Sequence, residues 1–391
     1  MLAFILAAAA AAPQPLVPPA VRALHERLLV LDTHLDTPVN LGRPGWSFAE
    51  RHRFVDDISQ LDLPRMKEGG LDGGFFVIYT EQGPLTPEGY AAAKAHAWRR
   101  EAWIRAMVRE NARSMELAFT PDDARRIAAQ GKRVVFQSIE NSYPLGESVA
   151  ALKDFYDAGV RLAGPVHNGD NQFADAASRG KRTWGGLSPL GREWVKEANR
   201  LGILIDLSHA SDDVVDQVLE LSKAPVILSH SGPRALYDHP RNLDDARIKR
   251  IAAKGGVIQA NSVFLAPRDD RPERDTLSAR WESLEDASPR EAREAGQAWA
   301  KLEATQAANP VTFDRFMQSL LYLLKLVGPD HVGIGMDWDG GGGLIGMDDV
   351  SALPRITAAL KQAGYSDADV AKIWSGNLLR ALGEAQRLAE H

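Results

Sequence analysis

The chain has 391 residues, of which 45% are hydrophobic and 25% are charged, so it has enough apolar residues to bury a large core. Length alone allows either one large barrel or two medium-sized domains. The formal net charge of −6 and the pI near 6.0 argue against nucleic acid as the main partner, because binding phosphates requires a basic surface.

The sequence contains no cysteine. This excludes disulfide bonds, thiolate metal sites, a cysteine nucleophile and the N-terminal cysteine of a bacterial lipoprotein. Any bound metal must therefore be held by His, Asp and Glu side chains, which suit catalytic ions such as Zn²⁺.

The N-terminus, MLAFILAAAAAAPQPLVPPA, has the apolar run and the small residues of a secretory signal. No Lys or Arg precedes the run, and the alternative interpretation is an Ala-rich helix. The run is too short to span a bilayer stably. We expect residues 1–17 to be a signal peptide and the protein to be exported, either periplasmic or secreted. If the segment is not a signal, the protein is cytoplasmic.

Short apolar runs that end in a polar residue recur along the chain. Their length and apolar character are typical of strands buried on both faces. In chain order they are LLVLDTHLD, GGFFVIYT, RVVFQSIEN, GVRLAGPVHN, GILIDLSH, PVILSHS, GGVIQANS and HVGIGMDWD.

Segments with helical periodicity separate these runs, for example Pro87 to Leu117, Pro189 to Leu201 and Asp212 to Leu221. Two connections are long, from about Glu81 to Gly131 and from about Phe264 to Asp330. We expect them to add helices after the second and seventh strands. The charged first half of the second connection is interpreted as a solvated helix face rather than a binding tract.

Buried strands that alternate with amphipathic helices indicate parallel βαβ units. Eight such strands favour a closed (β/α)₈ barrel of the TIM type over an open sheet. No linker divides the chain, so we expect residues 18–391 to form one α/β domain.

The polar residues that end the runs form a candidate site, because catalytic residues in such barrels lie at the C-terminal ends of the strands. His34 and Asp36 end the first run, and their i, i+2 spacing puts both side chains on one face of an extended chain. A lone histidine at a strand end is more often structural, but seven coincident placements favour a metal site. The other five candidates are Glu140, His167, His209, His230 and Asp337.

These residue types predict a binuclear hydrolase. His34 and Asp36 can hold one divalent ion, and His209 and His230 can hold another. Glu140 is the candidate to bridge them, because a carboxylate offers one oxygen to each metal. Two ions about 3.5–4 Å apart would share a water and lower its pKa, so that hydroxide forms at neutral pH.

Two further strand-end residues fit the chemistry that follows. Asp337, beside the shared water, can accept a proton on attack and pass it to the leaving amine. His167 can face the substrate carbonyl and stabilise the oxyanion. The remaining histidines do not end a strand and are interpreted as structural or exposed.

The chain resembles the membrane (renal) dipeptidase family of zinc peptidases within the amidohydrolase superfamily. The likeness runs from DTHLDTP to IWSGNLLR, near the end of the chain. The motifs that carry it are GLSPLGREWVKEANRLGILIDLSHAS, APVILSHSGPRAL, HPRN and GIGMDWDG.

The resemblance implies two Zn²⁺ ions per subunit, bridged by Glu140 and a water or hydroxide. It also implies that Arg241 in HPRN pairs with the C-terminal carboxylate of the dipeptide, a contact that suits the planar fork of arginine. Tyr79, at the end of the second run, either belongs to the substrate-binding mouth or makes an ordinary aromatic core contact. The implied metal ligands are His34, Asp36, Glu140, His209 and His230; the implied substrate-polarising residue is His167, and the acid/base is Asp337.

The expected function is hydrolysis of dipeptides, L-Xaa-L-Xaa or L-Xaa-D-Xaa, by a metal-activated hydroxide. Two alternatives stay open: a binuclear hydrolase of another amide or ester, such as an N-acyl-D-amino acid or a lactone, and a metal-binding barrel whose catalysis has decayed. Mammalian members are disulfide-linked, lipid-anchored dimers, and this chain has neither cysteine nor an apolar tail. We therefore expect no stable membrane anchor, and a homodimer stays open.

Overall fold

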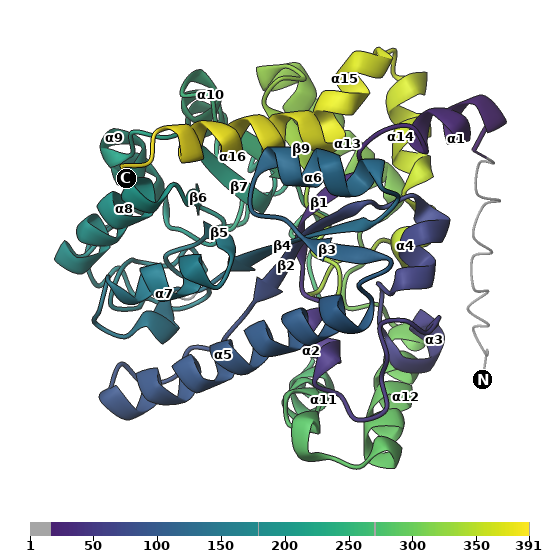
Figure 1. Ribbon diagram of the computed structural model, residues 1–391, viewed down its shortest axis with the longest axis horizontal. Coiled ribbons are helices and arrows are strands. Elements are labelled where there is room, and N and C mark those ends of the chain that lie inside the picture. The colour runs from purple at the N-terminus through teal and green to yellow at the C-terminus, as the bar shows by residue number, and fades with distance from the viewer. Residues whose placement is uncertain (1–16, 179, 270, 391) are drawn as a thin grey trace, which may run out of the picture.

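The computed structural model describes residues 17–178, 180–269 and 271–390 (Figure 1). The predicted signal peptide, residues 1–17, lies outside the described residues except for Val17. Within the described part of the chain, no helix is long and apolar enough to cross a membrane.

Eight parallel strands make up the barrel, in the order β1-β2-β4-β5-β6-β7-β8-β9. The barrel closes between its first and last strands. There, Leu35 pairs with Trp338 in parallel, and the Asp36 N–H donates to the Trp338 carbonyl at 2.8 Å. This arrangement confirms the predicted (β/α)₈ fold. The strands are β1 (Leu31–Leu35), β2 (Gly73–Ile78), β4 (Arg133–Ile139), β5 (Val160–Ala163), β6 (Leu204–Asp206), β7 (Val226–Ser231), β8 (Val257–Ala260) and β9 (Val332–Ile334).

One strand lies outside the predicted set. β3 (Met115–Leu117) pairs in parallel with the start of β4, off the barrel path. The helical segment predicted from Pro87 to Leu117 is therefore too long. Helix α5 spans Pro87–Glu110, and a turn at Asn111 leads into β3.

Helix ends follow the expected capping chemistry, as α8 (Pro189–Leu201) shows. The Ser188 side chain accepts from the Gly191 N–H, and Pro189 occupies the first turn. Gly202 ends the helix in the left-handed region at φ 74°. This helix and α9 (Asp212–Leu221) have the bounds predicted from the sequence.

The remaining helices fill the connections, and the predicted extra helices after the second and seventh barrel strands are present. α5 and α6 follow β2, and α11, α12 and α13 follow β8. The bounds are α1 (Pro19–His25), α2 (Pro38–Leu41), α3 (Phe54–Asp57), α4 (Leu63–Gly69), α6 (Pro121–Ala129), α7 (Ala151–Asp157), α10 (Asp245–Ala253), α11 (Pro272–Glu282), α12 (Pro289–Thr305), α13 (Phe313–Val327), α14 (Pro354–Gln362), α15 (Asp367–Ala371) and α16 (Asn377–Arg387). Short 3₁₀ turns span Tyr143–Leu145, Leu284–Asp286 and Val350–Ala352, and a π-helical turn spans Lys372–Gly376.

The two ends of the barrel are covered differently. Figure 1 shows α16 above the strands, and α5, α11 and α12 below them. Leu378, Leu382 and neighbouring residues of α16 share one buried apolar cluster with residues near the starts of the strands, such as Leu31, Phe75 and Leu204. This apolar plug closes the N-terminal end, so the polar strand-end residues gather at the opposite end.

Candidate metal centre

The structure brings all seven strand-end candidates together at the C-terminal end of the barrel. Ligand atoms from three overlapping groups of these residues each lie within 4.8 Å of one another. All seven side chains are buried except that of His167, which is partly exposed. The groups are His34, Glu140 and His230; Glu140, His167 and His209; and His34, Asp36 and Asp337.

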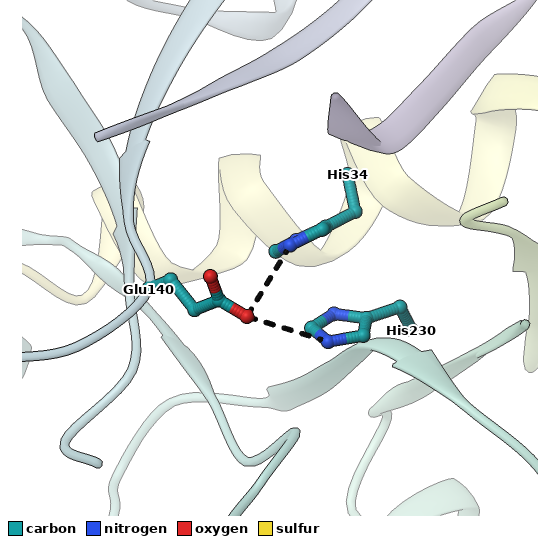
Figure 2. Close-up of side chains that lie close together, drawn as sticks. All are labelled: His34, Glu140 and His230. Carbon is teal, nitrogen blue, oxygen red and sulfur yellow. Dashed lines mark ion pairs between the residues drawn. The ribbon is translucent and has the colours of Figure 1, made fainter. Parts of the chain in front are cut away.

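Glu140 occupies the middle of the cluster. Its Oε1 atom lies 2.9 Å from His209 Nε2, 3.4 Å from His34 Nε2 and 3.6 Å from His230 Nε2. Figure 2 shows the side chains of His34 and His230 pointing toward this carboxylate. His167 Nε2 lies almost as close, at 3.7 Å. The position of Glu140 suits a bridging carboxylate, while distance alone does not separate His167 from the three other histidines.

Hydrogen bonds on the far side of the rings fix how two of these histidines present their nitrogens. His209 Nδ1 lies 3.2 Å from Asn168 Oδ1, an acceptor, so Nδ1 carries the proton and Nε2 is a bare lone pair. His230 Nδ1 lies 2.8 Å from Ser229 Oγ, whose own proton goes to Asp206 Oδ2. His230 Nε2 is therefore also a bare lone pair, 2.9 Å from His209 Nε2.

Acids and one histidine surround the first metal position that the sequence predicts. His34 Nε2 lies 3.3 Å from Asp36 Oδ2. Burial opposes charge on this ring, but Asp36 and Glu140 raise the pKa of His34 well above its ordinary value. Burial raises the pKa of Asp337 well above its ordinary value, and the neighbouring charges of Asp36 and Glu140 act in the same direction.

The backbone around these residues is held in an uncommon conformation. His209 and Asp337 have positive φ values of 68° and 65°, which non-glycine residues rarely adopt and which cluster at functional sites. Gly340 folds back over the acids. A Cβ atom at this position would lie 2.0 Å from Asp36 Oδ2 and 2.3 Å from Asp337 Oδ1, so any larger residue would have to displace the two carboxylates.

The cluster has the donor set of a divalent-metal site. Three histidine Nε2 atoms and the carboxylates of Asp36, Glu140 and Asp337 converge in a buried space. Among the described residues, His34 Nε2 is buried without a hydrogen-bond partner, and two lone pairs face each other at His209 and His230. Acceptors packed this closely need cations between them, because an uncompensated buried polar atom is costly. Nitrogen and oxygen donors without sulfur suit zinc and similar catalytic ions.

Comparison with known proteins identifies the family. The model of the membrane dipeptidase family (peptidase family M19) matches residues 19–391. The chain belongs to this family. Dipeptidase tcpJ of Claviceps purpurea is 30% identical over 368 residues, which cover 92% of this chain and 77% of that relative.

Solved structures agree with this membership. The probable dipeptidase PvdM from Pseudomonas aeruginosa has a TM-score of 0.81 and 34% identity, covering 95% of this chain and 98% of that one. A metallo peptidase from Rhodobacter sphaeroides, liganded with a phosphinate mimic of the dipeptide L-Ala-D-Ala, has a TM-score of 0.72 and 26% identity, covering 92% and 99%. The chain is a metal-dependent dipeptidase.

In this dipeptidase, Arg241 lies beside the cluster, and its role in binding the substrate stays a prediction. It is 2% exposed, and its Nη2 donates to the His230 carbonyl at 3.3 Å. Burial lowers the pKa of Arg241 to about 10, opposed by the charges of Glu140 and Asp337, and the group stays cationic at neutral pH. No carboxylate of the described residues forms an ion pair with it, which leaves its charge for a ligand.

Tyr79 lies at the mouth on the other side of the cluster. Its ring meets the His167 ring edge-on, with centroids 5.0 Å apart, and its hydroxyl donates to Glu81. The Arg100 guanidinium lies 5.7 Å from the centre of the Tyr79 ring. The structure therefore places Tyr79 next to a candidate site residue, and its role in substrate binding stays a prediction.

The residues that support the cluster were missed by the sequence analysis. Asp206 accepts from the backbone N–H groups of Ser208 and Ser229 at 3.0 and 2.9 Å, and Ser229 Oγ contacts His230. Asp32 accepts from the N–H groups of His34 and Met336, and burial raises its pKa to about 7. The available signal was a polar residue inside an apolar run, as in GILIDLSH and PVILSHS.

Proposed function

We propose that this dipeptidase binds two zinc ions and cleaves the amide bond of dipeptides at the mouth of the barrel. The observation that carries the proposal is the position of Glu140, whose Oε1 lies within 3.7 Å of the Nε2 atoms of four histidines. The residues that would hold the ions are His34, Asp36, Glu140, His209 and His230. When bound, the ions would polarise the scissile carbonyl and lower the pKa of a water molecule.

The chain's own residues supply the proton transfer and the binding of the substrate. Asp337 lies against Asp36 and Glu140, where an Oδ atom can take a proton from the attacking water and return it to the leaving amine. The Nε2 side of His167 faces Glu140 and can donate a hydrogen bond to the carbonyl oxygen as negative charge develops. Burial of the cluster excludes bulk water and strengthens these contacts.

Arg241 would orient the dipeptide. Its buried guanidinium can grip the C-terminal carboxylate through two parallel hydrogen bonds, which fixes the distance from that carboxylate to the scissile bond. Longer peptides would have no free carboxylate at that distance. The Rhodobacter relative was solved with a mimic of L-Ala-D-Ala, so both L and D residues at the second position belong in the substrate range to be tested.

The test combines a metal assay with substrate profiling. The purified protein is analysed for bound metals, stripped with a chelator, and titrated with Zn²⁺ while hydrolysis of L-Ala-L-Ala, L-Ala-D-Ala and N-acetyl-D-Ala is followed. We expect activity on the dipeptides to saturate at two equivalents of zinc. Full activity with fewer than two equivalents would contradict the binuclear centre. Cleavage of the N-acetyl compound without the dipeptides would contradict the proposed substrate.

A further inference from the structure

A second arginine lies at the mouth, on the same aromatic ring as Arg241. The Cζ atom of Arg241 lies 5.3 Å from the centre of the Phe264 ring, and the Cζ atom of Arg268 lies 6.0 Å from it. The His239 ring stacks on Phe264 with centroids 4.5 Å apart. We call these four residues the Phe264 platform.

The ring that carries this platform is held firmly. Phe264 has a positive φ of 57°, a conformation that a bulky residue adopts only when its surroundings impose it. The Asn242 side-chain amide donates to the carbonyls of Phe264 and Tyr237 at 2.8 and 2.9 Å. One side chain thus ties the loop after β7, which carries Arg241, to the loop after β8, which carries Arg268.

Arg268 lies against the chain that follows Asp337. A Cβ atom on Gly341 would be 3.0 Å from Arg268 Nη1, so the guanidinium packs directly on the glycine backbone there. Desolvation by the surrounding protein lowers the pKa of Arg268 although the side chain remains open to solvent, and the charge of Asp337 acts in the opposite direction. The same Asp337 charge acts on Arg241, so both arginines lie close enough to the proposed acid/base to be influenced by its charge.

Apart from Asp337, two acids near Arg268 in the sequence or in space, Asp269 and Glu303, already have partners. Asp269 forms ion pairs with Arg271 at 2.9 Å and with Arg274 at 3.0 Å. Glu303 accepts from Arg274, from Trp299 Nε1 at 3.0 Å and from the Ala308 N–H at 2.8 Å. Within the described residues, no carboxylate lies within ion-pair distance of Arg268. Its positive charge is therefore exposed to whatever enters the mouth.

We propose that the Phe264 platform selects dipeptides whose C-terminal residue carries a second carboxylate, that is, an aspartyl or glutamyl side chain. The inference rests on the proposed function, in which Arg241 binds the α-carboxylate. One carboxylate needs one arginine. Both guanidinium groups lie within 6.0 Å of the Phe264 ring centre, so a side chain that extends from the residue held by Arg241 can offer a second carboxylate to Arg268. Charge-assisted contacts of this kind are about twice as strong as neutral ones.

The test compares substrates that differ in charge but hardly in size. Values of kcat/KM are measured for L-Ala-L-Asp against L-Ala-L-Asn, and for L-Ala-D-Asp against L-Ala-D-Asn. We expect the Asp compound to be preferred by about tenfold or more in at least one configuration, the effect of a hydrogen bond to a charged group. Arg268→Gln should bring that preference close to one. The Arg268 side chain is exposed, so the substitution does not disturb the core.

The matched control is Arg271→Gln, on the same loop but paired with Asp269. It should keep the preference. An Asp-to-Asn ratio near one in the unmodified enzyme would overturn the inference while leaving the proposed function intact. An equal loss of preference in both variants would also overturn it, because the loop rather than Arg268 would then be responsible. Cleavage of none of the four dipeptides would overturn the proposed function and this inference with it.

Discussion

Buried histidines lie at both ends of the barrel, and their hydrogen bonds differ. At the N-terminal end, His25 is fully buried, its Nδ1 accepting from Thr357 Oγ1 at 2.7 Å and its Nε2 donating to the Gly69 carbonyl at 2.9 Å. Thr357 in turn accepts from Trp374 Nε1 at 2.8 Å. Both ring nitrogens of His25 therefore have a complementary protein partner, and the ring links α1, α4, α14 and the π-helical turn.

At the C-terminal end, only one nitrogen of each ring is satisfied in this way. His209 and His230 use Nδ1 for Asn168 and Ser229, and both turn a bare Nε2 toward Glu140. The comparison teaches that burial does not mark a functional histidine. A ring with both nitrogens satisfied by protein stabilises the fold, whereas a ring with one nitrogen held and the other aimed at a carboxylate is prepared for a cation.

The largest effect should come from Glu140, which distinguishes the C-terminal cluster from the N-terminal histidine. Glu140→Gln keeps the size but removes the charge that four imidazoles face. We expect the variant to lose bound metal and to lose more than about 10³-fold in kcat/KM, since it removes the proposed bridging carboxylate as well as electrostatic stabilisation. Metal analysis and dipeptide hydrolysis measure both. Glu116→Gln, at the surface on β3, is the control; normal metal content in Glu140→Gln would contradict the bridging role.

Asp337→Asn separates the proposed acid/base from the proposed ligands. The amide preserves the shape of the side chain but cannot carry the proton to the leaving amine. We expect kcat to fall by about 10²- to 10⁴-fold, the usual contribution of a general acid–base group, with two metal equivalents retained. A variant that loses metal together with activity would show that Asp337 acts as a ligand instead, and unchanged kcat would remove it from the chemistry.

Most of the fold follows from the sequence because buried parallel strands give continuous apolar runs, and each of the predicted runs contains a barrel strand. β3 has only three residues, of which Met115 alone is fully buried, so it gives no run to detect. The predicted end of α5 was wrong because no sequence signal marks it. The helix continues its polar pattern to Glu110, and the turn at Asn111 includes a hydrogen bond from its own side chain to the Met107 carbonyl.

The strand-end positions of the site were predictable because the barrel gathers the ends of its strands at one mouth. The arginines were not predictable in the same way. Arg268 lies in a loop and Arg100 on a helix, and their guanidinium groups lie near the rings of Phe264 and Tyr79 at the mouth. Such contacts depend on how two distant connections pack together, and no spacing within either segment encodes them.

Ser229 sharpens the comparison, since its hydroxyl accepts from a C-terminal histidine, whereas the Thr357 hydroxyl donates to His25. Its Oγ lies 2.8 Å from His230 Nδ1 and 3.4 Å from His34 Nδ1, with Asp206 accepting its proton. Ser229→Ala should weaken zinc binding by about 10- to 100-fold in a chelator competition, the usual effect of removing such a supporting contact. Ser231→Ala, on the same strand and with a hydroxyl that has no hydrogen-bond partner among the described residues, should bind the metal normally. Equal affinities in the two variants would contradict the supporting role.

The smallest effect concerns His25 and appears in stability rather than in catalysis. Burial lowers the pKa of His25 from 6.5 to about 4. Between these two values the unfolded chain binds about one proton more than the folded chain, so stability rises with pH. The contribution of His25 is fully present above about pH 6.5 and is lost as the pH falls toward 4. From pH 7 to pH 5 the loss amounts to about 2 kcal/mol in the free energy of unfolding.

The matched variant is His25→Gln, because an amide can still donate to Gly69 and accept from Thr357 but does not titrate in this range. Denaturant unfolding of both proteins, each stripped of metal, at pH 7 and at pH 5 isolates the contribution of His25. Other buried histidines titrate equally in the two proteins and cancel in the difference. The variant should lose less stability than the parent on acidification while keeping its metal content and its dipeptidase activity at pH 7. Equal losses in the free energy of unfolding of the two proteins between pH 7 and pH 5 would mean that His25 accepts a proton in the folded state. That result would contradict the contrast between His25, whose two nitrogens both have protein partners, and the histidines that face the metal centre.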